Sequence, residues 1–129
     1  MTFRFDLSMS WIAANFKKDK KMVDPFKMSA SELGDAFENN LINPVEVLEA
    51  YFEAIQKSTL TERIYVEVTK KRAFGEAEDA RKRQKSGLRM GPLDGVPISW
   101  KDLFDIAGHE TTAGSDLLKG RMPQTDCAI

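Results

Sequence analysis

A short apolar run that ends in a lysine is the feature that most constrains what this chain can fold into. The run is V-P-I-S-W at residues 96–100, and Lys101 and Asp102 follow it directly. The preceding G-P-L-D-G favours a turn, because glycine reaches positive φ and proline fixes φ. A polar, turn-rich segment closes the block at residues 108–115. A buried ammonium is costly unless it is paired or neutralised, so a lysine at the end of a buried strand indicates a special role.

Amphipathic segments upstream of this block predict helices. Two of them open with helix-start signals, namely Ser29 with Glu32 as a capping box, and Asn43, Pro44 and Glu46 as N-cap, first and third residues. A third helix is predicted over residues 70–86, ended by Gly87. The stripes at helical spacing are expected to form the core: Leu33, Ala36, Phe37, Leu41; Val47, Leu48, Tyr51, Phe52, Ile55; and Ala73, Phe74, Ala77, Ala80, Gln84.

Two segments are predicted as strands. In residues 63–69, isoleucine and two valines alternate with tyrosine, glutamate and threonine, and residues 96–100 form the apolar run. The helix over residues 70–86 separates them. This order predicts an α/β fold, with N-terminal helices followed by the first strands of a mixed sheet flanked by helices.

Composition and charge exclude several classes of protein. At 129 residues, 42% hydrophobic and 30% charged, the chain has the composition of one small globular domain. Its net charge of −1 gives no electrostatic reason for a nucleic-acid or membrane partner. The single cysteine, Cys127, excludes an internal disulfide and a cysteine-based metal site. No apolar run approaches a membrane span and no secretory signal is present, so we expect a cytoplasmic protein without a cofactor.

Residues 1–24 differ from the remainder. Apolar residues alternate with polar ones over residues 3–11, which predicts a half-buried strand, and a basic cluster follows at residues 17–21. We interpret this segment as an N-terminal extension that packs on a neighbour or stays mobile. An oligomer contact or a membrane-surface arm is the alternative. The domain proper is expected over residues 25–129.

The sequence G-P-L-D-G-V-P-I-S-W-K-D, followed by T-T-A-G-S, resembles the N-terminal part of the amidase signature family, over roughly residues 26–129. Members are serine hydrolases that cleave amide bonds with a Ser–Ser–Lys triad. The lysine of the family's P-I-x-x-K-D motif falls on Lys101, so the resemblance implies that Lys101 is catalytic and deprotonates a bridging serine. The family's two serines lie in a downstream Gly/Ser-rich segment, which these 129 residues do not contain. The chain alone is therefore expected to be inactive.

Other polar residues are weaker candidates. Ser99 would share a strand face with Lys101. By resemblance, Thr111, Thr112, Gly114 and Ser115 form a turn that supports the site, although a Ser115–Lys101 dyad is an alternative. His109 is expected to be exposed and without a metal, Asp94 and Asp105 to be turn residues rather than an acid/base pair, and Cys127 to be a buried thiol in a helix.

Three functions are compatible with these patterns. The first is hydrolysis of a small-molecule carboxylic amide to an acid and ammonia or an amine. The second is the amidase subunit of a tRNA-dependent amidotransferase, which releases ammonia from glutamine. The third is a non-catalytic interaction fragment whose open strand edges associate. The sequence leaves assembly into a homo-oligomer open.

Overall fold

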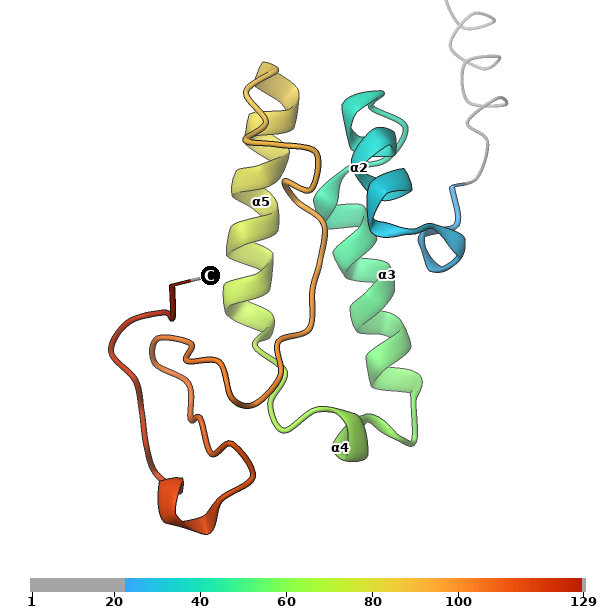
Figure 1. Ribbon diagram of the computed structural model, residues 1–129. Coiled ribbons are helices and arrows are strands. Elements are labelled where there is room, and N and C mark those ends of the chain that lie inside the picture. Colours follow the sequence, from blue (N-terminus) through green and yellow to red (C-terminus); the bar gives the residue numbers. More distant parts are fainter. Residues whose placement is uncertain (1–22, 129) are drawn as a thin grey trace, which may run out of the picture.

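The computed structural model describes residues 23–128, and its regular elements are helices (Figure 1). In chain order these are η1 (Pro25–Lys27), α2 (Ala30–Glu38), α3 (Pro44–Lys57), α4 (Thr61–Ile64), α5 (Lys70–Ser86) and η2 (Asp116–Leu118). Helices α3 and α5 lie side by side and antiparallel. The strand and basic cluster predicted within residues 1–22 lie outside the described residues, and the domain boundary at residue 25 stays a prediction.

Local side-chain hydrogen bonds set the helix ends. Ser29 Oγ accepts from the Glu32 N–H at 3.3 Å, and Glu32 accepts from the Ser29 N–H at 2.7 Å. Asn43 caps α3 in the same way, accepting from the Glu46 N–H at 3.1 Å while the Glu46 carboxylate accepts from the Asn43 N–H at 3.1 Å. Each box satisfies donors that the first helical turn leaves unpaired. Both predicted boxes are confirmed, as is the end of α5 at Gly87 with φ 69°.

The core forms where the predicted stripes meet. One cluster joins α2 to α3 through Leu33, Phe37 and Val47, and a second joins α3 to α5 through Leu48, Phe52 and Ala77. The buried amide of Gln84 in α5 donates to the carbonyls of Phe37 and Ile42 at 2.8 and 3.0 Å. This bond ties α5 to the C-terminal end of α2. The prediction was wrong for Leu41, which follows the end of α2 and is 51% exposed.

The predicted α/β fold is wrong for the part of the chain that the structure describes. Residues 61–64 form the helical turn α4, in which the Tyr65 N–H donates to the Thr61 carbonyl at 2.9 Å. Residues 96–100 are not in a ladder. Alternation indicates only which side of a strand would be buried, whereas a strand needs a hydrogen-bonded neighbour, and between residues 23 and 128 neither segment has one. Pro97 also lacks the N–H that a central strand would donate.

The G-P-L-D-G turn is held between the helices. A Cβ atom added to Gly34 of α2 would lie 2.0 Å from the Pro92 carbonyl oxygen, and one added to Gly95 would lie 2.6 Å from Pro44 Cγ at the start of α3. These close approaches require glycine, and Gly95 also has φ +90°. The turn therefore fixes the point from which the chain runs toward Lys101.

Two arginines complete the fixation of this turn. Arg83 of α5 donates to both carboxylate oxygens of the buried Asp94 at 2.9 and 2.6 Å. Arg89 donates to the carbonyls of Pro92 and Asp94 at 3.0 and 3.3 Å, and to Glu38 at 2.8 Å. The bidentate Arg83 contact lowers the pKa of Asp94 below its usual value. The turn is thus anchored to α5 and to the end of α2.

Candidate active site around Lys101

Lys101 lies where the apolar run ends and the chain reverses. Its carbonyl accepts from the N–H groups of Leu103 and Phe104 at 2.7 and 3.1 Å, which closes a turn directly after the lysine. The Lys101 side chain is exposed, and within residues 23–128 it has no ion-pair partner. The predicted burial of Lys101 against its apolar neighbours is wrong, because Ile98 and Trp100 are 63% and 46% exposed.

A groove of about 460 Å³ brings Lys101 together with residues from two other segments. One wall comes from residues 64–69, which follow α4, and the other from residues 109–114. Tyr65, Glu67 and His109 contribute polar groups to this groove, and Ile64 and Phe104 contribute apolar surface. Lys101 is thus the lysine of a mixed, open groove rather than of a closed apolar pocket.

Asp102 directs its charge at the loop that follows, although the sequence leaves open whether it pairs with Lys101. Its carboxylate accepts from the Thr112 N–H at 3.0 Å and from the Thr112 hydroxyl at 2.5 Å. These bonds, with the desolvation cost opposing them, lower the pKa of Asp102 below its usual value. The carboxylate is therefore engaged by Thr112.

The loop over residues 111–115 is compact and strained. Thr111 is buried and its N–H donates to the Arg121 carbonyl at 3.1 Å, while the Ser115 N–H donates to the Thr112 carbonyl at 2.9 Å. Ala113 and Gly114 both have positive φ, 50° and 70°. Positive φ is costly for alanine, so the surrounding contacts must hold it in place.

The structure does not bring the two candidate serines into the Lys101 groove. The Ser99 hydroxyl lies 3.5 Å from the Tyr65 hydroxyl, and Ser99 lines a neighbouring apolar groove. Ser115 lies at the end of the loop, outside the lining of the Lys101 groove, whereas Thr111, Ala113 and Gly114 are part of that lining. The proposed supporting role of the T-T-A-G-S turn stays a prediction.

Two expectations for the remaining candidates are wrong. His109 is half-buried rather than exposed, and its Nδ1 lies 2.7 Å from the Glu67 carboxylate. Cys127 is half-buried and is not in a helix. Glu67 was not singled out from the sequence, and no local signal could have paired it with a histidine 42 residues away.

Carboxylate–arginine pairs attach the irregular C-terminal segment to the helices. Arg72 of α5 donates to both oxygens of Asp126 at 2.8 and 2.7 Å, and the Ala107 N–H donates to Asp126 at 2.8 Å. The Arg72 contact holds the pKa of Asp126 far below its usual range. Asp105 is paired with Arg121 at 2.5 and 2.6 Å, which lowers the pKa of Asp105 as well. Ion pairing is thus the observed role of Asp105, as it is of Asp94.

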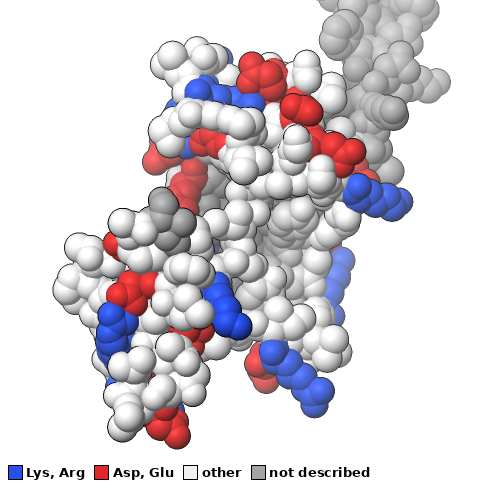
Figure 2. All heavy atoms as spheres, viewed as in Figure 1, with Lys and Arg blue, Asp and Glu red and all other residues white. Residues whose placement is uncertain are grey.

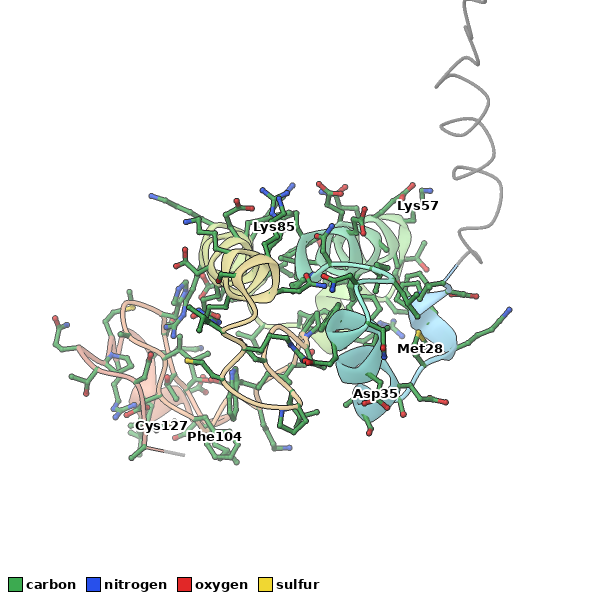
Figure 3. The ribbon with its side chains drawn as sticks, turned by 90° about the horizontal axis from the view of Figure 1, so that it is seen from above. Met28, Asp35, Lys57, Lys85, Phe104 and Cys127 are labelled. Atoms are coloured by element: carbon green, nitrogen blue, oxygen red, sulfur yellow. The ribbon has the colours of Figure 1, made fainter. Side chains whose placement is uncertain are left out.

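Seen from above, Phe104 and Cys127 lie on one side of the helices, and Lys85 near the end of α5 lies on the other (Figure 3). Acidic and basic side chains are interspersed over the face drawn in Figure 2. Between residues 23 and 128, no group of three His, Cys, Asp or Glu side chains is arranged to hold a metal ion. No helix in that range is long and apolar enough to cross a membrane.

Comparison with known proteins gives one matching family. The model of the family described as Amidase matches residues 46–129, which include Lys101 and the whole groove. The match begins later than the resemblance expected from residue 26. No solved structure matches the chain.

Several curated relatives are named as one type of glutamyl-tRNA(Gln) amidotransferase subunit. The chain is 35% identical over 101 residues to the mitochondrial form of this subunit from Homo sapiens, covering 78% of this chain and 19% of the relative. It is 34% identical over 102 residues to the mitochondrial form from Ornithorhynchus anatinus, covering 79% and 19%. It is 30% identical over 108 residues to the form from Streptomyces coelicolor, covering 84% and 22%. The chain thus spans about a fifth of the length of these relatives, and over residues 46–129 it belongs to the amidase signature family.

Proposed function

We propose that this chain supplies the lysine base of an amidase subunit that releases ammonia from glutamine for transfer to glutamyl-tRNA. The observation that carries the proposal is Lys101, which lies in the family's lysine motif, within the matched range, on an open groove. The shared name of the relatives supports the amidotransferase over an amidase that acts on free small-molecule amides. The tRNA-linked substrate replaces the expectation of no nucleic-acid partner.

The chemistry requires an amine that can take up a proton. Serine is a weak nucleophile at neutral pH and needs a base to remove its proton. Lysine serves as that base only in its neutral form, which an adjacent ion pair would disfavour. Asp102, the neighbour that could form such a pair, is bound to Thr112 instead. The amine of Lys101 therefore remains free to receive a proton, through a bridging serine as the family resemblance implies.

Within this proposal, the two serines and the oxyanion-hole donors come from a part of the enzyme outside these 129 residues. The test uses a chimera in which the full 129-residue chain replaces the segment that it matches in the Streptomyces coelicolor relative. The chimera is expressed with the other subunits of that amidotransferase. Ammonia release from glutamine and amidation of glutamyl-tRNA are both measured.

Lys101→Ala in this chimera is expected to lower kcat for ammonia release by about 100- to 10,000-fold, the usual contribution of a general base. Lys101→Arg is expected to be equally inactive, because a guanidinium does not deprotonate in proteins. Lys85→Ala is the matched control, since Lys85 is an exposed lysine on the opposite side of the helices. Activity in the Lys101→Ala chimera equal to that of the Lys85→Ala chimera would refute the assignment.

The second candidate is an amidase for free small-molecule amides, favoured only by the family match. It predicts that the chimera hydrolyses simple amides in a Lys101-dependent manner but does not amidate glutamyl-tRNA. Measuring both reactions on the same preparation therefore separates the two candidates.

A further inference from the structure

We propose that Asp102 is a positioning residue whose carboxylate, through Thr112, holds the 111–115 loop as a wall of the groove that Lys101 lines. The proposal rests on the proposed function of Lys101. It concerns a second residue of the K-D pair, and it assigns Asp102 a role through the loop rather than through its charge on Lys101.

The first supporting observation is that the carboxylate is fully engaged by one residue of this loop. One oxygen accepts from the Thr112 N–H at 3.0 Å and the other from the Thr112 hydroxyl at 2.5 Å. The Thr112 hydroxyl oxygen in turn accepts from the Gly114 N–H at 3.3 Å. A chain of hydrogen bonds therefore runs from Asp102 into the turn itself.

The second observation is that the loop needs such a hold. Ala113 adopts φ 50° and Gly114 adopts φ 70°, and a left-handed alanine persists only where other contacts impose it. The successive N–H groups of such a turn form a concave site that favours an anion, and here the Asp102 carboxylate occupies that position. Its negative charge and the loop conformation stabilise one another.

The third observation is that the loop and the lysine border the same space. Ala113 and Gly114 line the groove of about 460 Å³ beside Lys101, while the Asp102 backbone directly follows that of Lys101. Release of the loop would change the groove wall that faces Lys101, without removing the lysine. A displacement of about 1 Å at a reacting centre can cost about 100-fold in rate.

The experiment compares Asp102→Asn, Thr112→Val, Thr112→Ser and the Asp102→Asn/Thr112→Val double variant in the chimera described above. Thr112→Val removes the hydroxyl and keeps the side-chain shape, whereas Thr112→Ser keeps the hydroxyl. We expect Asp102→Asn and Thr112→Val each to lower kcat by about 10- to 100-fold, with little change in KM. Thr112→Ser is expected to restore activity close to that of the unchanged chimera. Because both changes break one linkage, the double variant is expected to lose little more than either single variant.

The pH profile of kcat distinguishes positioning from a direct effect of charge. If Asp102 acted on Lys101 by its charge, Asp102→Asn would lower the pKa of the ammonium, and the acidic limb of the profile would move to lower pH. Thr112→Val would leave that limb in place. A limb that moves only in Asp102→Asn, full additivity in the double variant, or unchanged kcat in Thr112→Val would each overturn the proposal.

Lys101→Ala measured in the same series keeps this test separate from the test of the proposed function. Activity that does not depend on Lys101 rejects the proposed function. Activity that depends on Lys101 but not on Asp102 and Thr112 rejects the positioning role alone. Far-ultraviolet circular dichroism of each variant shows whether the helices are retained, so that a loss of kcat without a loss of helix is assigned to the site.

Discussion

The contact between α2 and the G-P-L-D-G turn predicts that alanine at Gly34 destabilises the protein, although alanine favours helices. Gly34 lies inside α2, where replacing glycine by alanine ordinarily stabilises a helix by about 1 kcal/mol. In this structure the added Cβ would lie 2.0 Å from the Pro92 carbonyl oxygen. Since Cβ atoms do not approach within 3.0 Å of other heavy atoms, the turn or the helix would have to move by about 1 Å.

The magnitude follows from comparison with a second helical glycine. A Cβ atom added to Gly75 in α5 would meet nothing within 4 Å, so Gly75→Ala carries the propensity gain alone. Overpacking costs about 1–3 kcal/mol, so Gly34→Ala is expected to be destabilising by up to about 2 kcal/mol after the gain is subtracted. The propensity contribution cancels in the difference between the two variants. That difference, about 1–3 kcal/mol, measures the contact itself.

The assay is urea unfolding of the 129-residue chain, followed by far-ultraviolet circular dichroism. Gly75→Ala is expected to raise the midpoint and Gly34→Ala to lower it, with the same denaturant dependence of the free energy of unfolding in both. Equal stabilisation by the two substitutions would show that α2 and the turn are not in contact. The position of the turn would then give no support to the placement of Lys101.

Two further stability changes follow from the same structure. Asn43→Ala removes the side-chain cap of α3 and is expected to lower the free energy of unfolding by about 1 kcal/mol, measured by urea unfolding; an unchanged midpoint would contradict the capping bonds. Asp94→Asn tests a pH dependence, because Arg83 lowers the pKa of Asp94 in the folded state. The stability that this pair contributes is present above the unfolded pKa of about 4 and is lost as the pH falls toward the lower folded value. Between about pH 5 and pH 3 the variant should therefore lose less stability than the unchanged chain, and parallel losses would refute the pairing.

The helices could be predicted because their signals are local. Asn43 and Glu46 lie in the same helical turn, and the bonds between them depend on that turn alone. The apolar spacing of residues 70–86 likewise identifies the face that α5 buries. The strands failed for the opposite reason, since alternation over residues 63–69 and 96–100 cannot supply the neighbour that a ladder requires.

The candidate site divides in a similar way. The family resemblance identified Lys101, whereas reasoning from its apolar neighbours predicted a buried lysine and the structure places it on an open groove. The pairing of Asp102 with Thr112 and of His109 with Glu67 joins residues 10 and 42 positions apart. No periodicity links such residues, so only the folded chain shows which loop Asp102 binds.

Carboxylates determine how the segment after α5 is held, which explains why its apolar pattern does not predict its conformation. Residues 88–128 contain no α-helix or strand, so their backbone groups are not paired in regular ladders. Asp94, Asp102 and Asp126 replace those ladders by binding an arginine, a backbone N–H or both, and each has a lowered pKa as a result. These three side chains are spread along the segment on both sides of Lys101. The position of the lysine therefore depends on charged side chains that bind distant residues, while the helices beneath it depend on apolar burial.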